Sequence, residues 1–171
     1  MTSVTLPHSG SVPLPWTSVL QATLIVGSLD LCLALGVQFM ATGGMNLVRI
    51  LHTIAAGLIG PVARDGGAAT ATLGVGLHYV IAGIWTTIFA VMLSRLGVVR
   101  AMTSTMPRQV LTGLAWGVVI WMGMNLVVLP LSQLHAMPRF TSTTPVMIAG
   151  HAVLVGIPIV LTLVMGARRS R

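Results

Sequence analysis

Residues 140–167 read FTSTTPVMIAGHAVLVGIPIVLTLVMGA, a stretch in which Asp, Glu, Lys and Arg are all absent. Two earlier stretches, Gly66 to Ser94 and Gln109 to Pro138, also contain none of these four residue types. A helix of ~20 apolar residues crosses a hydrocarbon core of about 30 Å, because each residue adds about 1.5 Å. Each stretch is longer than that, so the sequence predicts three helices that span a membrane.

The composition of the whole chain indicates the same class of protein. Of its 171 residues, 55% are hydrophobic and 6% are charged, and the mean hydropathy is +0.96. A soluble globular domain carries about 25% charged residues, so this chain lacks the groups that a water-facing surface needs. Disorder is excluded as well, because it requires low hydrophobicity and high charge. A further apolar run, Ser18 to Val37, adds one more predicted span.

These observations predict an all-α integral membrane protein, a four-transmembrane-helix bundle that forms a single domain over residues 18–167. Residues 1–17 lack the basic residues and the cleavage site of a signal peptide, so we expect a mobile polar tail there. Residues 168–171 are expected to form a basic tail. The spans are predicted near residues 18–37, 70–93, 109–131 and 145–166.

The arginines predict the orientation of the bundle. The net charge of +7 comes entirely from arginines that are spread thinly between apolar runs, a pattern that does not suggest nucleic-acid binding. Arginines gather on the cytoplasmic side of membrane proteins. Six of them lie between the second and third spans or after the fourth, and three lie on the opposite side. We therefore expect both termini in the cytoplasm.

A segment of different character, about residues 45–60, lies between the first two spans. Leu51 and Ile54 share one helical face, whereas Asn46, Arg49 and Thr53 share another. Arg49 and His52 make a full crossing costly. The pattern predicts an interfacial amphipathic helix, and a fifth span is the alternative.

Each predicted span carries one strongly polar side chain at a similar depth in the outer half of the membrane. These side chains are Asp30, His78, Asn125 and His151. Intramembrane polar residues are costly, so they usually face the bundle interior and find partners. One interpretation is a polar site for a proton, a metal ion or a small solute. The other is a hydrogen-bond network that fixes the register of the helices.

Metal and redox chemistry have limited support. His78 and His151 lie on different spans and would allow bis-histidine haem ligation. Met147 and His151 are four residues apart on one helical face and would suit copper(I). Methionine is an ordinary apolar filler, however, and the chain has 11 of them. We expect no cofactor and no metal, with His151 and Met147 as the alternative copper ligands.

Two features predict how the helices pack. Gly113 and Gly117 form a GxxxG motif in the third span, which suits close contact between helices. Pro158 removes a hydrogen bond to the carbonyl of Leu154 and should kink the fourth span. The single cysteine, Cys32, excludes an intrachain disulfide and is expected to be a small buried packing residue.

The order of several residues resembles a known family. His78 opens the helix LHYVIAGIWTTIFAV, the segment GLAWGVVIWMGMNLVVLPLS ends with Asn125 and Pro130, and Gly150 and His151 lie early in the last helix. This order, over roughly the last hundred residues, resembles the YagU-type inner-membrane proteins of bacteria. The resemblance implies a multi-pass protein of the bacterial inner membrane. The family has no established activity, so the resemblance assigns no catalytic residues.

The sequence contains no GxSxG, HExxH, GxxxxGK[ST] or GxGxxG motif. We therefore expect a non-enzymatic membrane protein with an intramembrane polar network, whose partner is the lipid bilayer. The alternatives are a small homo-oligomeric transporter or proton/ion pathway, a haem or copper redox carrier, and a subunit of a larger membrane complex.

Overall fold

The structure, a computed structural model, describes residues 15–138 and 140–170, and they form helices and connecting loops without strands. Four of the helices are long and apolar enough to cross a membrane, which fits a multi-pass membrane protein. The first two are α1 (Trp16–Thr42) and α3 (Gly67–Arg95). The third runs through α5 (Met106–Gly123), η2 (Met124–Val128) and α6 (Leu129–Leu131), and the fourth through α7 (Thr144–Gly150), η3 (His151–Gly156) and α8 (Ile157–Arg169).

The long helices extend beyond several of the predicted boundaries. Helix α1 begins at Trp16, inside the predicted tail, and α8 continues through Arg169, inside the predicted basic tail. Hydropathy marks only the part of a helix that suits hydrocarbon, whereas backbone hydrogen bonding continues into polar residues beyond it. Helix α1 stops at Gly43, whose positive φ of 73° lets its N–H bond to the carbonyl of Phe39. Residues 1–14 and 171, the rest of the two predicted tails, lie outside the described residues.

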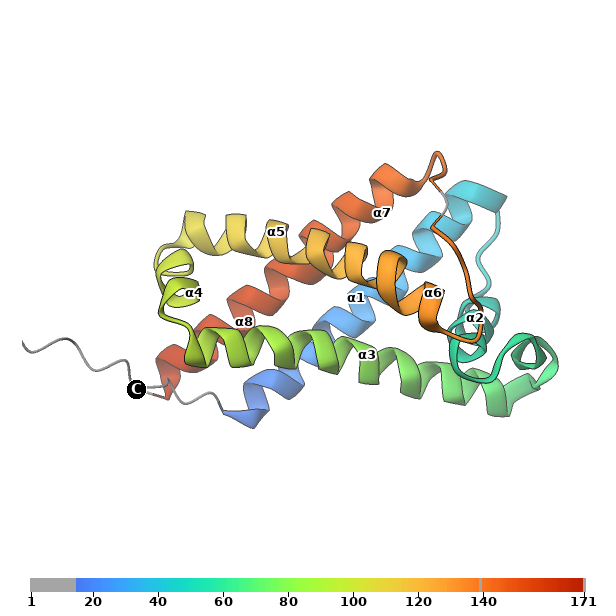
Figure 1. The fold of residues 1–171 in the computed structure, drawn as a ribbon, viewed down its shortest axis with the longest axis horizontal. Coiled ribbons are helices and arrows are strands. Elements are labelled where there is room, and N and C mark those ends of the chain that lie inside the picture. Colours follow the sequence, from blue (N-terminus) through green and yellow to red (C-terminus); the bar gives the residue numbers. More distant parts are fainter. Residues whose placement is uncertain (1–14, 139, 171) are drawn as a thin grey trace, which may run out of the picture.

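The long helices run lengthwise between two ends of the bundle (Figure 1). The start of α1, the end of α3, the start of α5 and the end of α8 meet at one end, together with the short helix α4 (Gly97–Met102). This α4 end carries five of the described arginines: Arg95, Arg100, Arg108, Arg168 and Arg169. The other end carries α2 (Leu47–Ile59), the 3₁₀ helix η1 (Pro61–Asp65) and the loop between α6 and α7.

The hydrophobic core fills the half of the bundle nearer the α4 end. Its fully buried members include Val26 of α1, Phe89 of α3, and Ile159 and Leu163 of α8. The core is continuous across all four long helices. The cysteine of α1, in contrast, is exposed, so the prediction of a buried Cys32 was wrong. In a chain with few soluble surface groups, an exposed apolar position of this kind suits lipid.

Glycines bring the third and fourth long helices into close contact. A side chain at Gly117 would meet the backbone of His151 and Ala152, and one at Gly113 would meet the backbone of Ile157. Gly156 faces Gly113 and Gly117 from the opposite helix. The GxxxG motif therefore lies at a backbone-to-backbone crossing, as the spacing predicted.

Each of these two helices widens into a π-helical segment just before a proline. In η2 the N–H of Leu129 bonds to the carbonyl of Met124, and in η3 the N–H of Ile157 bonds to the carbonyl of Ala152. Both bonds span five residues, where an α-helix spans four. Pro130 and Pro158 follow directly and have no N–H to donate. The local disturbance predicted at Pro158 thus includes a widened turn that begins at His151.

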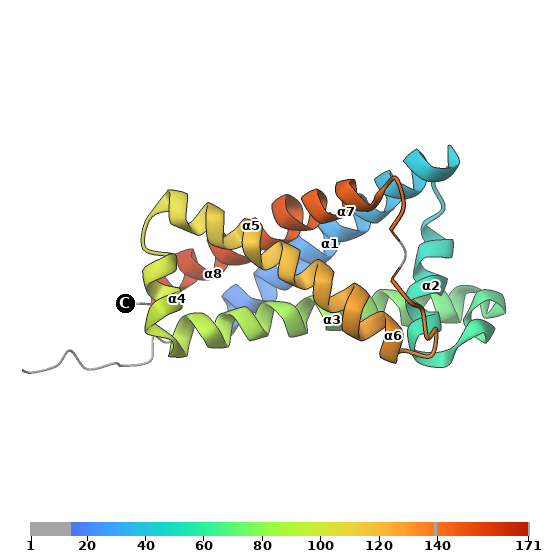
Figure 2. The ribbon, with the colours of Figure 1, turned by 45° about the horizontal axis from the view of Figure 1, so that its top comes forward.

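Helix α2 lies crosswise to the long helices at the end where α1 ends and α3 begins (Figure 2). It has 13 residues, fewer than the ~20 of a span. Its Leu51 backbone packs at Gly74 of α3, where a side chain would clash. Ala55 and Ala56 of α2 are buried in a small cluster against which Leu73 of α3 packs. The face that contacts α3 therefore includes small residues that the amphipathic pattern did not single out, and the interfacial position of α2 stays a prediction.

Replacing the residue that caps α2 should loosen this helix. The Asn46 side chain accepts a hydrogen bond from the backbone N–H of Arg49 at 2.9 Å. Loss of such a cap costs about 1 kcal/mol, so Asn46→Ala should speed amide hydrogen exchange in α2 about fivefold and leave α8 unchanged. Asn46→Asp keeps an acceptor and should match the wild type. Equal exchange rates in the wild type and Asn46→Ala would contradict this role.

Candidate functional site

A cavity of about 440 Å³ occupies the half of the bundle nearer α2. Its lining comes from α1, α2, α3 and both of the long helices that contain π segments. Val26, Ile120, Val155 and Ile159 belong both to the core and to this lining, so the packed half of the bundle forms one wall. The cavity is within the usual size range of small-molecule sites, roughly 300–1,000 Å³.

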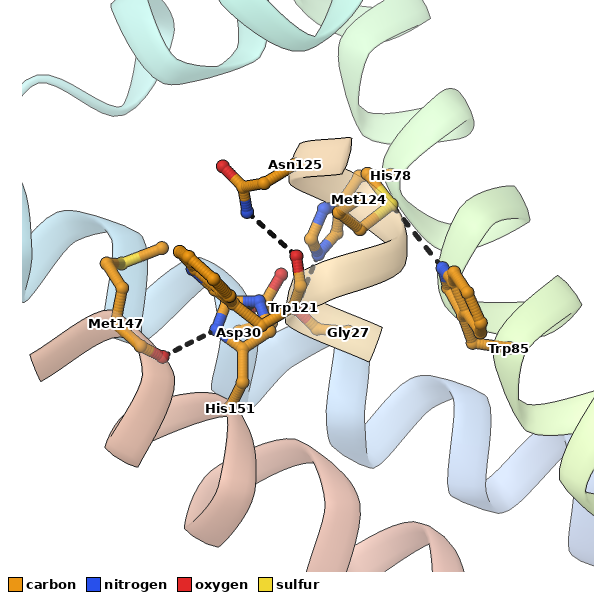
Figure 3. Close-up of polar contacts among 9 residues, drawn as sticks. All are labelled: Gly27, Asp30, His78, Trp85, Trp121, Met124, Asn125, Met147 and His151. Carbon is orange, nitrogen blue, oxygen red and sulfur yellow. Dashed lines mark hydrogen bonds and ion pairs between the residues drawn. The ribbon is translucent and has the colours of Figure 1, made fainter. Parts of the chain in front are cut away.

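The structure brings all four of the predicted polar side chains to this one cavity. Asp30 of α1, His78 of α3, Asn125 of η2 and His151 of η3 all line it, as does Met147 of α7. Figure 3 shows their polar contacts. The remaining lining is mainly aliphatic, with Trp85 and Met124 beside it. The four helices therefore place a small polar cluster in an apolar chamber.

Asp30 and His151 form the direct contact between two helices within the cluster. The Nε2 atom of His151 lies 3.4 Å from Oδ1 of Asp30. The His151 side chain is 9% exposed and that of Asp30 is 30% exposed. The carboxyl group therefore retains an accessible surface, while the imidazole is almost enclosed.

The other nitrogen of His151 indicates where the imidazole carries a hydrogen. Nδ1 lies 2.8 Å from the backbone carbonyl of Met147 (Figure 3). A carbonyl only accepts, so Nδ1 carries a hydrogen and donates it. A neutral ring would then turn the lone pair of Nε2 toward the carboxylate of Asp30, which is repulsive. One proton between Nε2 and Oδ1 removes the repulsion, so this geometry suits a pair that holds one proton and has no net charge.

His78 joins α3 to α1 at the level of Gly27. Its Nε2 atom lies 2.8 Å from the Gly27 carbonyl, so Nε2 is the donor. The neighbouring Tyr79 packs against the same glycine, where a side chain would meet its ring, and its hydroxyl bonds with that of Ser28 at 2.9 Å. Gly27 thus provides both the acceptor and the space for this crossing, and His78 is held one turn from Asp30 along α1.

The π segments position the two polar residues of the third and fourth long helices. The Asn125 side chain donates to the carbonyl of Trp121 at 2.9 Å, just as His151 donates to the carbonyl four residues before it. Met124, the residue directly before Asn125, accepts a hydrogen bond from the indole of Trp85 at 3.4 Å. Widened turns of this kind are frequent at functional sites.

The histidines do not form an evident metal centre. In the part of the chain that the structure describes, no three His, Cys, Asp or Glu side chains gather closely enough to hold a metal ion. His78 uses Nε2 on Gly27, and His151 uses Nδ1 on Met147, so bis-histidine ligation through both Nε2 atoms requires His78 to give up its bond. The contact between Met147 and His151 is made by the backbone carbonyl of the methionine, which is not the atom that would bind copper(I).

Sequence reasoning missed several residues of the cavity wall. Thr53 of α2 lines it, although the pattern placed Thr53 on the polar face away from Leu51. Ser132 and Trp85 also line it, as do Ile50 and Ile54 of α2. The separate polar and apolar faces of α2 predicted an amphipathic helix. Only its crosswise position in the structure shows that residues of both faces line the cavity.

The histidine tautomers provide a direct check of this geometry. We expect nitrogen NMR of labelled protein in bilayers to show a protonated Nε2 on His78 and a protonated Nδ1 on His151, because each faces a carbonyl. Single His→Gln variants would assign the signals, with His135 of the α6–α7 loop as the control position. An unprotonated Nδ1 on His151 would contradict the arrangement of the pair.

Comparison with known proteins gives no relative: no protein family, curated protein or solved structure matches this chain. The resemblance to YagU-type proteins therefore stays a prediction.

Proposed function

We propose that this protein is a small multi-pass transporter in which the Asp30–His151 pair exchanges a proton with a solute held in the cavity. The position of the pair carries the proposal: the contact of 3.4 Å lies in the wall of a cavity of about 440 Å³. Intramembrane carboxylates and histidines are the groups from which proton relays are built. The pair supplies the proton site, and the apolar chamber supplies space for a solute.

The competing function is the structural one, a polar network that only holds the helices in register. The bond between His78 and the Gly27 carbonyl favours this role, because it joins two helices. Although Nε2 of His151 contacts Asp30 of α1, its Nδ1 and the Asn125 side chain direct hydrogen bonds to carbonyls of their own helices. Such bonds do little to fix neighbouring helices, and the accessible surface of Asp30 is not needed for a structural link. The accessible carboxyl group of Asp30 in the cavity wall therefore favours the site interpretation.

The proposal includes a location and an orientation. The α4 end carries most of the described arginines, so it faces the cytoplasm by the positive-inside rule. The cavity then lies in the outer half of the membrane, covered by α2 at the interface. The resemblance to YagU-type proteins supports the bacterial inner membrane, where a proton gradient is available to drive exchange.

The test uses purified protein in liposomes that contain a pH-sensitive dye and an acidic interior. Three solutes with the same ring are added outside in turn: benzyltrimethylammonium, benzenesulfonate and benzyl alcohol. None of them carries a titratable proton near neutral pH, so a change of internal pH reports exchange by the protein. We expect at least one solute to speed the loss of internal protons severalfold over protein-free liposomes. Rates equal to those of protein-free liposomes for all three would overturn the proposal.

A further inference from the structure

We infer that the solute is a lipophilic organic cation, which replaces the proton of the Asp30–His151 pair one for one. This inference rests on the proposed function and adds the chemical class of the ligand. It follows from three properties of the cavity: the charges that face it, the chemistry of its apolar wall, and the single proton that the geometry of the pair accommodates.

The charges that face the cavity are few and can be counted by element. Its ionisable lining residues are Asp30 from α1, His78 from α3 and His151 from η3, while α2, α5, η2, α6, the α6–α7 loop, α7 and α8 contribute only uncharged ones. None of the described arginines lines it, and Asp65, the second carboxylate of the chain, lies in η1 outside the lining. Among the described residues, Asp30 is therefore the one anion available to a ligand in this cavity.

The energetics of a low-dielectric chamber favour exchange of like charges. An unpaired charge in such a place is costly, and the pair with its proton has no net charge. When the proton leaves, the pair carries one negative charge. A monovalent cation in the cavity restores neutrality, whereas an anion would add a second negative charge. The balance is one proton released to water for each cation bound, with no bond formed or broken apart from that to the proton.

The wall suits a cation that is bulky and apolar. Leu77, Ile81, Val128 and Leu129 supply aliphatic surface, and Trp85 supplies an aromatic ring. Aromatic faces attract ammonium groups through the charge distribution of the ring. A small, strongly hydrated metal cation would need several oxygen ligands, and the cavity presents few of them. An organic ammonium group with an aryl or alkyl body matches both the carboxylate and the hydrophobic surface.

The test is calorimetric titration of the full-length protein in nonionic detergent with benzyltrimethylammonium. Measurements in two buffers of different ionisation enthalpy give the number of protons released. We expect one cation bound and one proton released. Because the proton competes with the cation, affinity should fall as the pH is lowered, by at most tenfold per pH unit. Benzenesulfonate, with a similar ring and the opposite charge, should bind at least tenfold more weakly.

Two variants separate charge from shape. Asp30→Asn should weaken cation binding at least tenfold and abolish proton release, whereas Asp65→Asn should behave like the wild type. Equal affinity for the cation and the sulfonate would overturn the inference, and so would unchanged cation affinity in Asp30→Asn. If Asp30→Asn does not fold, the proton count and the pH dependence of the wild type decide instead. If the sulfonate or the alcohol drives proton movement in liposomes and the cation does not, the inference fails while the proposed function stands.

Discussion

Asp30→Asn should reduce solute-dependent proton movement in liposomes at least tenfold. The asparagine amide can donate a hydrogen bond to Nε2 of His151, the atom that lies 3.4 Å from the Asp30 carboxylate in the native pair. The substitution therefore mimics the protonated pair in shape but has no proton to release. Internal pH, followed by the dye under the conditions that give the largest wild-type rate, measures the effect.

Two controls make this result specific to the pair. Asp65→Asn removes the other carboxylate of the chain, which lies in η1 outside the cavity, and should leave the rate unchanged. The unfolding temperature of Asp30→Asn should stay within a few degrees of that of the wild type, because the contact between α1 and η3 persists. If the network were purely structural, Asp30→Asn would lower the unfolding temperature and leave the rate of proton movement unchanged.

Gly117→Leu should destabilise the bundle by about 3 kcal/mol, the upper part of the range for overpacked sites. A side chain at this position would lie 2.5 Å from the Cα atom of Ala152 and would also meet the His151 carbonyl. These are backbone atoms of a neighbouring helix, so no rotamer change can relieve the clash. Chemical unfolding in detergent measures the change in the free energy of unfolding.

Gly76→Leu is the matched control, because a side chain at Gly76 would meet nothing within 4 Å. It should be neutral or slightly stabilising, since leucine is the better helix former. The displaced helix in Gly117→Leu carries His151, so proton movement should fall in any protein that remains folded. Similar unfolding free energies for the two variants would show that the third and fourth long helices are not in close contact at this crossing.

The sequence was sufficient for the coarse fold, because hydropathy and helix length both follow from the bilayer. The helix that contains His151 was predicted over 145–166 and found over Thr144–Arg169. The small difference arises because the apolar pattern does not include residues at the two ends of the helix. The rise per residue predicted a similar depth for the four polar side chains, and the structure places all four at one cavity: Asp30, His78, Asn125 and His151. Their role in transport remains a prediction.

The remaining features of the site depend on contacts that cannot be predicted from residue types. The acceptor for His78 is the backbone carbonyl of Gly27, and every residue has a carbonyl. Thr53 lines the cavity because α2 lies crosswise to the long helices. This position depends on tertiary packing, which the sequence of α2 alone does not reveal. The turn at Asn125 was predicted with α-helical spacing, whereas η2 is π-helical, so the direction of side chains around the helix axis changes there.

The widened turns before Pro130 and Pro158 have a consequence for how such a chain can change in evolution. A π turn holds one residue more than an α turn, so it behaves as a single-residue insertion in a helix. Deleting one residue from η3 would restore regular α-helical bonding, and the parts of the helix before and after it would keep their orientation, because the widened turn alone takes up the extra residue. His151 and Ile159 would then still face the same cavity, and the wall between them would lose the widened turn. A homologue that is one residue shorter here would be an intact membrane helix with a narrower turn at this wall.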